Sequence, residues 1–235
     1  MGGYVMKQFV FHFDKDGYHI TVKLPRSYYQ ACDSRYPALI VHDGDDLFKK
    51  LKSEIIFIGI ESPKRAHDFT PWAAQVNDQE TKGQADQYLG WLVETLIPDL
   101  RAQFRICDKR EKLGISGASY GALVALYALY RYPETFGKFM LISPSLWYPN
   151  FIEFMKREVS ISTAVDVYWY VGLKEGIRHT HRLKEMVPNS LEGQRLLKGA
   201  LQNHDASLYF ETSRRGIHRQ RYFKKYFKRG VCQLF

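Results

Sequence analysis

The sequence is poor in cysteine, with only Cys32, Cys107 and Cys232 among its 235 residues. Three cysteines this far apart form neither a disulfide framework nor a zinc site, so we expect a reducing, cytoplasmic location. Long apolar runs are missing too, and none approaches the roughly 20 residues that a membrane-spanning helix needs. The first residues also lack a basic stretch followed by an apolar core. We therefore expect no secretory signal and no membrane partner.

Internal repeats, low-complexity tracts and linkers rich in Pro, Gly or Ser are absent as well. We therefore draw no domain boundary and expect a single domain over residues 1–235. Hydrophobic residues make up 45% of the chain and charged residues 25%. That composition is typical of globular proteins and excludes an intrinsically disordered chain.

Strand and helix patterns alternate along the chain. Lys7–Phe13 and Tyr18–Lys23 flank a turn, Asp-Lys-Asp-Gly, and predict a β-hairpin. Short apolar runs predict six more strands, at Ala38–His42, Ile55–Ile60, Lys112–Ser116, Phe139–Ile142, Val165–Val171 and Leu208–Glu211. Helical spacing predicts helices over 84–103, Ala122–Tyr132 and His218–Lys228. The alternation predicts an α/β fold with a mostly parallel central sheet, an N-terminal hairpin and helices on both faces.

The stretch Gly117-Ala118-Ser119-Tyr120-Gly121 matches the pattern Gly-x-Ser-x-Gly. A strand is expected before it and an Ala-rich helix after it, which is the setting of a nucleophile elbow at the carboxyl end of a strand. Such a turn exposes the serine hydroxyl beside a helix N-terminus, whose dipole favours developing negative charge. The alternative is an ordinary strand-to-helix turn in which Ser119 or Ser116 caps the helix. Ser119 is our candidate nucleophile.

A serine hydroxyl needs a base, and in this arrangement the base is a histidine late in the chain. His218 follows the last expected strand and opens the last expected helix, so it is the candidate base. The alternative is a surface residue at a helix start. His42 ends an earlier strand and is expected to pack beside the site. His179 and His181 have no third ligand nearby in the sequence, so we expect no metal there.

The acid that orients the base is expected at the carboxyl end of the Val165–Val171 strand. Glu175 is the one carboxylate in that turn, whereas Asp166 lies at the other end of the strand. Glu175 is therefore the candidate acid. The alternative is a Ser-His dyad with Glu175 as a solvated loop residue, and the sequence leaves both open.

The oxyanion of a tetrahedral intermediate also needs N–H donors. The backbone N–H of Tyr120, directly after the candidate nucleophile, is the first candidate. The second is expected in the loop after an early strand, from the backbone N–H of Gly44 or Asp45. That acidic loop lacks the length and the closing Glu of a calcium loop. We expect no metal and no cofactor.

Acidic residues are absent from residues 214–229, which hold eight Lys and Arg and so supply +8 of the net charge of +9. Three interpretations of this basic segment remain open. In the first, it forms a terminal amphipathic helix that docks an aromatic face on the body and leaves its cations in solvent. The aromatic face consists of Tyr222, Phe223, Tyr226 and Phe227.

In the second interpretation the basic segment attracts an anionic substrate, because Arg214, Arg215 and Arg219 lie close to His218 in sequence. Arg214 and Arg215 are therefore candidate substrate-binding residues. The third is binding to single-stranded nucleic acid, for which basic and aromatic residues are suited. No recognised nucleic-acid module surrounds the segment, so we expect no nucleic-acid partner.

Several stretches resemble, in order and over nearly the whole chain, the esterase branch of the α/β hydrolases that contains enterochelin esterases and S-formylglutathione hydrolases. They are Tyr36-Pro37, Asp43-Gly44, 65–72, Glu94 to Pro98, Gly117 to Gly121, Tyr132-Pro133, 143–147 and Gly216-Ile217-His218. Two of them, Arg-Ala-His-Asp-Phe-Thr-Pro-Trp at 65–72 and Ser-Pro-Ser-Leu-Trp at 143–147, are particularly similar to the smaller, cytoplasmic ferric-siderophore esterases.

The resemblance implies an α/β-hydrolase fold and hydrolysis of a carboxylic ester through an acyl-enzyme. A ferric-siderophore lactone or a related ester is the implied substrate. By matching positions, Ser119 is the nucleophile and His218 the base, while Arg65 and Trp147 are candidates for contacting a small, anionic ester.

The sequence departs from the family at Tyr120, where a small residue or Met is common, and the loop with Glu175 matches only loosely. The substrate therefore stays open. One alternative is a general acyl-ester, thioester or aryl-ester hydrolase of the same fold. The alternative of another class is a non-catalytic binding protein on a hydrolase fold.

Overall fold

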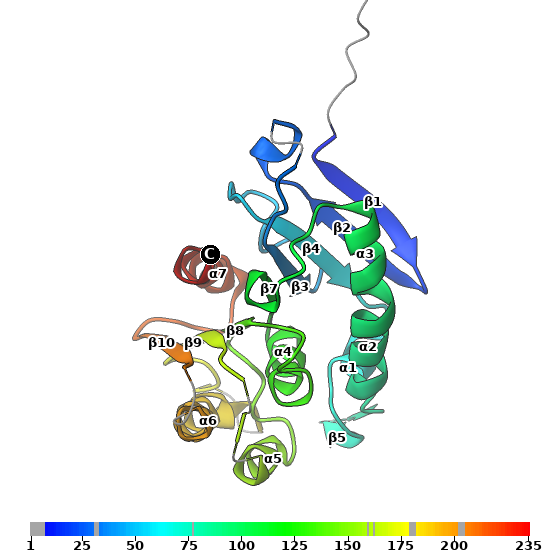
Figure 1. Ribbon diagram of the computed structural model, residues 1–235. Helices are drawn as coiled ribbons and strands as arrows, with labels where there is room; N and C mark the ends of the chain where they lie inside the picture. The colour runs from blue at the N-terminus through cyan, green and yellow to red at the C-terminus, as the bar shows by residue number, and fades with distance from the viewer. Residues whose placement is uncertain are drawn as a thin grey trace, which may run out of the picture.

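The computed structural model describes residues 8–30, 33–76, 78–158, 160–161, 163–178, 182–201 and 205–235. Eight strands form one sheet in the order β1-β2-β4-β3-β7-β8-β9-β10 (Figure 1). Their bounds are β1 Val10–Lys15, β2 Tyr18–Lys23, β3 Ala38–His42, β4 Ile56–Glu61, β7 Leu113–Ala118, β8 Lys138–Ile142, β9 Asp166–Gly172 and β10 Ser207–Ser213. The pairs β1–β2 and β2–β4 are antiparallel and all others are parallel. The predicted mostly parallel sheet with an N-terminal hairpin is confirmed.

Helices lie on both faces of the sheet, as predicted. One face is covered by α2 (Ala85–Trp91), α3 (Ile97–Gln103), α4 (Tyr120–Arg131), α5 (Phe151–Arg157) and α6 (Met186–Ala200), and the other by α7 (Gln220–Leu234) (Figure 1). Between β4 and α2 the chain forms α1 (Arg65–Asp68) and a small hairpin, β5 (Ala74–Val76) and β6 (Gln79–Thr81). Short 3-10 turns occupy Arg26–Tyr29, Arg110–Lys112 and Arg182–Glu185. Among the described residues, no helix combines the length and the apolar character that crossing a bilayer requires.

The predicted elements differ from the observed ones mainly at their ends. β3 spans Ala38–His42 as predicted, whereas β7 continues past Ser116 to Ala118 and α4 starts at Tyr120 instead of Ala122. The strand and the helix therefore meet directly at Ser119. The last helix begins at Gln220 and not at His218, because Arg219 has an extended backbone and is its N-cap. His218 consequently lies in the loop before α7.

The predicted helix over 84–103 consists of three pieces, since a π-helical stretch, Leu92–Leu96, joins α2 to α3. Pro98 lies two residues after that stretch and has no N–H to donate to the carbonyl of Glu94, four residues before it, so the helix widens there. The sequence analysis missed α5 and α6. The second of these contains Pro188 and Gly193, which are poor helix formers and hide its pattern.

The sheet separates two apolar cores, and α7 provides much of the smaller one. Buried side chains of α7 in this core are Phe223, Tyr226, Phe227, Val231 and Leu234. Tyr226 stacks on Tyr170 of β9 with 3.6 Å between ring centroids. The aromatic face of the basic segment therefore docks on the sheet, as the first interpretation of that segment predicts.

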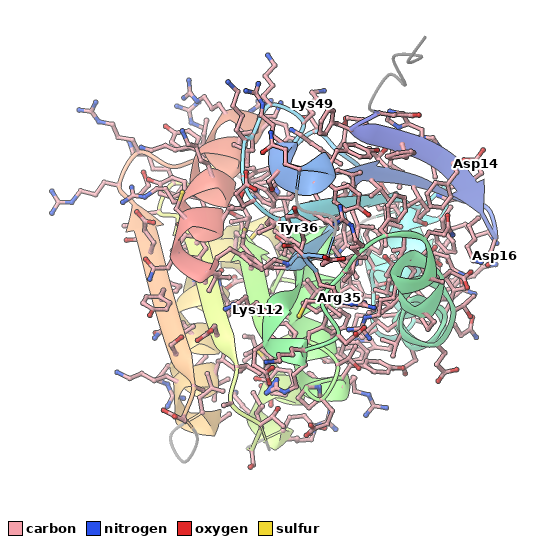
Figure 2. All side chains as sticks on the ribbon, turned by 45° about the horizontal axis from the view of Figure 1, so that its top comes forward. Asp14, Asp16, Arg35, Tyr36, Lys49 and Lys112 are labelled. Atoms are coloured by element: carbon pink, nitrogen blue, oxygen red, sulfur yellow. The ribbon has the colours of Figure 1, made fainter. Side chains whose placement is uncertain are left out.

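The cations of α7 are exposed. Lys224 pairs with Asp46 at 2.9 Å and Arg229 with Glu211 at 2.8 Å. Figure 2 shows long, nitrogen-ended side chains projecting from the α7 side of the molecule, with the β1–β2 hairpin and its Asp14 and Asp16 on the opposite side. The basic segment is thus a solvated helix face with a few ion pairs.

Removing the Phe227 ring should destabilise the fold. Phe227 is fully buried, so we expect Phe227→Ala to lower the free energy of unfolding by about 3–5 kcal/mol, measured by urea denaturation. Lys228→Ala, on the exposed face of the same helix, is the control and should change stability by less than about 0.5 kcal/mol. Similar losses in both variants would contradict the docking of α7 described above.

Candidate active site

Ser119 lies at the carboxyl end of β7, where that strand meets α4. Its backbone has φ 59° and ψ −117°, a strained conformation that nucleophile elbows adopt. The N–H of Ser119 donates to the Ile142 carbonyl at 3.0 Å, and the N–H of Ser145 donates to the Ser119 carbonyl at 3.2 Å. The Ser119 hydroxyl makes no capping hydrogen bond to α4, which argues against the helix-cap alternative.

The two glycines of the elbow pattern are needed because the start of α4 packs directly on the ends of β7 and β3. A Cβ at Gly117 would lie 2.4 Å from the carbonyl carbon of Gly121, and one at Gly121 would lie 2.9 Å from the Cβ of His42. Both distances are too short for any side chain. The Gly-x-Ser-x-Gly spacing thus reflects close packing as well as backbone strain.

Glu175 follows β9 and is 1% exposed. One carboxylate oxygen, Oε2, accepts a hydrogen bond from Nδ1 of His218 at 2.7 Å. The other, Oε1, accepts from the Ser143 hydroxyl at 2.7 Å and from the Gly172 N–H at 2.9 Å. Since an ionised carboxylate only accepts, the His218 proton sits on Nδ1. The alternative of a solvated Glu175 does not fit this burial.

The structure adds two serines that the sequence analysis did not assign to the site. Ser143 directly follows β8, has φ 50° and donates to Glu175. Ser145 is fully buried, and its Oγ lies 3.0 Å from the Oγ of Ser119. Their position at the carboxyl end of a parallel strand is the signal that would have identified them.

His218 and Ser119 flank the site from two different loops. Among the described residues, the Ser119 hydroxyl is hydrogen-bonded to Ser145 and has no hydrogen bond to His218. The His218 side chain is 34% exposed and meets the Phe223 ring edge-on, with 4.8 Å between centroids. Catalytic hydrogen bonds often form only when substrate binds. Either hydroxyl can donate in the Ser119–Ser145 contact, so Ser119 can accept from Ser145 and keep its own proton for His218.

The candidate oxyanion donors differ in availability. Tyr120 is the first residue of α4, where an N–H has no acceptor within the helix. The Gly44 N–H, in contrast, donates to the Ile60 carbonyl at 3.2 Å, which counts against Gly44 as the second donor. In the described part of the chain, the N–H of Asp45 has no backbone acceptor. Asp45 is therefore the better of the two candidates in that loop.

Two cavities share Ser119 and Arg65 in their walls. The larger has a volume of about 400 Å³ and is also lined by Tyr120 and Trp147, and the smaller has about 280 Å³. Arg65 donates through Nη2 to Oδ2 of Asp43 at 2.8 Å and through Nε to Oδ1, so the guanidinium is held by both oxygens. Arg65 and Trp147 thus line one cavity together with Ser119.

The candidate residues of the basic segment are placed differently. Arg214 and Arg215 are exposed, and neither lines the cavities at Ser119. Arg219 lines another cavity, together with His218 and Glu175. The proposed role of Arg214 and Arg215 in binding substrate therefore receives no support from their position.

His42 lies fully buried under the elbow. Its Nδ1 is 2.8 Å from the carbonyl oxygen of Ser116, so this nitrogen carries the proton. Burial lowers the pKa of His42 to about 4, because the protonated ring would lose its hydration. His42 is thus a neutral packing residue beside the site, as expected.

No three His, Cys, Asp or Glu side chains of the described ranges gather in a way that could hold a metal ion. His179 and His181 lie outside the described residues.

Comparison with known proteins identifies the family. The profile of the Esterase family, described as "Putative esterase", matches residues 15–234. The chain belongs to this family. It is therefore an enzyme that acts on ester bonds, and the predictions of a hydrolase and of the esterase branch are confirmed.

Relatives and solved structures agree with this assignment. The esterase is 30% identical over 231 residues to the uncharacterised protein YbbA of Bacillus subtilis, covering 92% of this chain and 91% of that one. It is 28% identical over 172 residues to the siderophore enterobactin esterase of Emericella nidulans, covering 58% and 56%. The crystal structure of an IroE-like serine hydrolase from Shewanella oneidensis superimposes with a TM-score of 0.82 at 19% identity, covering 96% of this chain and 79% of that one. The predicted α/β-hydrolase fold is confirmed.

The buried His42 should make stability depend on pH. In the folded protein its pKa is about 4, whereas the unfolded chain takes up the proton near pH 6.5. Between these values the unfolded state binds more protons, so stability falls as pH falls. We expect the contribution of His42 to unfolding free energy to drop by roughly 3 kcal/mol between pH 7 and pH 4.

Urea denaturation of the wild type and of His42→Gln at several pH values tests this expectation. Both proteins contain the same carboxylates, so the contribution of carboxylate titration cancels in the difference between their unfolding free energies. The difference in unfolding free energy should shrink as pH falls from 6.5 towards 4. A constant difference over that range would contradict a neutral, buried His42.

Proposed function

We propose that this esterase forms an acyl-enzyme on Ser119, with His218 as the base and Glu175 as the acid that orients it. The observation that carries the proposal is the 2.7 Å contact between His218 Nδ1 and the buried carboxylate of Glu175, in a fold that also holds Ser119 in the elbow conformation. The three side chains follow β7, β9 and β10, whose carboxyl ends lie at one edge of the sheet. This is the chain order serine, acid, histidine of the fold.

In the proposed first step His218 takes the proton of the Ser119 hydroxyl through Nε2, while Oγ attacks the carbonyl carbon. Glu175 stabilises the imidazolium that forms. The imidazolium then protonates the alcohol oxygen as the ester C–O bond breaks, and the acyl group stays on Ser119. In the second step the neutral ring removes a proton from water, which attacks the acyl carbon. The imidazolium then gives that proton to Oγ as the bond between Oγ and the acyl carbon breaks, so the acid leaves and the serine is restored.

The negative charge on the tetrahedral oxygen needs donors in both steps. We assign them to the backbone N–H groups of Tyr120 and Asp45. The dipole of α4, a helix of 12 residues that starts at Tyr120, adds to their effect. Donors of this kind are worth about 10²–10³-fold in rate each.

We infer that the substrate is a small-molecule ester of the siderophore type, such as a trilactone. The similarity to the siderophore enterobactin esterase of Emericella nidulans supports this substrate class. The cavities at Ser119 support it as well, since they offer a guanidinium on Arg65 and aromatic rings on Tyr120 and Trp147, 5.6 Å apart. Such walls suit an aromatic acyl group with polar substituents.

A fluorophosphonate should label the protein once, on Ser119, since only an activated serine reacts. Ser119→Ala should abolish the adduct in intact-protein mass spectrometry and lower kcat by about 10⁴-fold or more. Ser160→Ala, which changes an exposed serine, is the control and should keep the adduct. An adduct on another serine would show that the nucleophile is misassigned.

The same two variants test the substrate class. The wild type and Ser160→Ala should release the linear product from a ferric trilactone siderophore, and Ser119→Ala should not. If only simple acyl, thioester or ferulate-type aryl esters are hydrolysed, the serine assignment stands and the siderophore assignment falls.

Glu175→Gln separates a triad from a dyad. The amide can still accept from Ser143 and Gly172 through its oxygen, but it then presents an NH₂ group to Nδ1 of His218. This favours the wrong tautomer, so kcat should fall by about 10³-fold or more. Glu134→Gln, at an exposed carboxylate, removes the same charge and should leave kcat unchanged. A loss of less than tenfold in Glu175→Gln would instead support a Ser-His dyad.

A further inference from the structure

A third cavity lies beside the proposed base and acid. It has a volume of about 610 Å³ and is lined by His218 and Glu175 but not by Ser119. Its walls come from the loop after β9, the start of α6 and the loop before α7. The base therefore faces a space that is separate from the two cavities at Ser119.

The walls of this cavity are apolar and its rim is cationic. Ile177, Met186 and Ile217 contribute apolar surface, and Lys174, Arg178 and Arg219 contribute exposed cationic side chains. Among the described residues these three cations have no ion pair. The one carboxylate in the lining, Glu175, is buried and bonded to His218. The cavity therefore presents uncompensated positive charge.

The cavities at Ser119 differ in charge. Their one cation, Arg65, is held by both carboxylate oxygens of Asp43, and Asp78 lies in the same lining. The positive charge of Arg65 is therefore balanced by Asp43, and Asp78 adds a negative charge to these cavities. The two sides of the proposed site thus differ in the charge that they offer to a substrate.

The chemistry of ester cleavage assigns the two sides to the two halves of the substrate. The acyl carbon bonds to Ser119, whereas the alcohol oxygen takes its proton, and the electron pair of the broken C–O bond, beside His218. The alcohol half must therefore extend from the His218 side. This reasoning rests on the function proposed above and refines its substrate.

We propose that the cavity at His218 binds the alcohol half of the substrate, and that this half has an apolar body with an anionic group such as a carboxylate. The apolar walls bind the body, and Lys174, Arg178 and Arg219 attract the anion. Most of the recognised negative charge then lies on the leaving group and not on the acyl group.

Esters that differ in the place of the charge test the proposal. 4-Acetoxybenzoate has its carboxylate on the alcohol half, 4-acetoxybenzamide is its neutral counterpart, and monophenyl succinate has its carboxylate on the acyl half. In Lys174→Gln/Arg178→Gln the ratio of kcat/KM for 4-acetoxybenzoate to that for 4-acetoxybenzamide should fall about five- to tenfold. In the same variant, the ratio of kcat/KM for monophenyl succinate to that for its neutral counterpart, phenyl butyrate, should change less than twofold. Each substrate is compared between proteins, so its intrinsic reactivity cancels.

Arg157→Gln/Lys198→Gln is the matched control. It removes two exposed cations from α5 and α6 that line neither this cavity nor those at Ser119. Both ratios should stay within twofold in this variant. If the ratio for 4-acetoxybenzoate falls equally in Lys174→Gln/Arg178→Gln and in the control, only the overall charge of the protein matters. If the ratios for 4-acetoxybenzoate and for monophenyl succinate fall equally in Lys174→Gln/Arg178→Gln, the cavity has no preference for a charge on the alcohol half. Either result would overturn the proposal.

Binding of the product gives a readout that does not depend on turnover. Ser119→Ala should bind 4-hydroxybenzoate more tightly than 4-hydroxybenzamide in calorimetric titrations, and adding Lys174→Gln/Arg178→Gln should remove the preference. Absence of a preference in Ser119→Ala would refute the anion site even if the esterase assignment holds. Failure of fluorophosphonate labelling at Ser119, with the preference intact, would refute the proposed nucleophile and leave an anion site.

Discussion

The buried carboxylate of Glu175 is the interaction on which the site depends. It joins three segments that are far apart in the sequence: Ser143 after β8, Gly172 at the end of β9 and His218 before α7. Leaving a buried charge without its partners costs about 3–5 kcal/mol, so these segments must adopt compatible positions together. Backbone bonds from Leu173 to Ser213 and from Lys174 to Gly216, both 2.9 Å, add to the same junction. Fold stability and the placement of His218 are thereby coupled.

The basic segment takes part in this coupling through its aromatic residues. The stacking of Tyr226 on Tyr170 fixes α7 against β9, and Phe223 holds the ring of His218 edge-on. The loop that holds His218 is therefore anchored at one end by β10 and at the other by α7. The cations of α7 itself are exposed, so solvent screens them. The aromatic contacts of α7 therefore link this segment to His218.

The proposed catalytic residues all lie in turns at strand ends, and the strands themselves can vary in sequence while the fold is kept. A structure with 19% identity superimposes with a TM-score of 0.82, because the sheet needs only buried apolar side chains at the right positions. The elbow is an exception. There Gly117 approaches the backbone of Gly121, and Gly121 approaches the side chain of His42, so closely that no other residue fits. Sequence constraints are therefore strong at the strand ends and weak along the strands.

The sequence by itself determined the alternation of strands and helices, the elbow at Ser119 and the proposed order of serine, acid and histidine along the chain. These features depend on periodicity and on neighbours a few residues apart, which a sequence displays directly. The tertiary structure decided the rest. It buried Glu175 among three donors, put Ser145 beside Ser119 and left Arg214 and Arg215 in solvent. It also tied the Gly44 N–H to Ile60. Contacts of this kind join residues from adjacent strand ends or across the sheet, and they depend on strand register and helix packing, which no local pattern specifies.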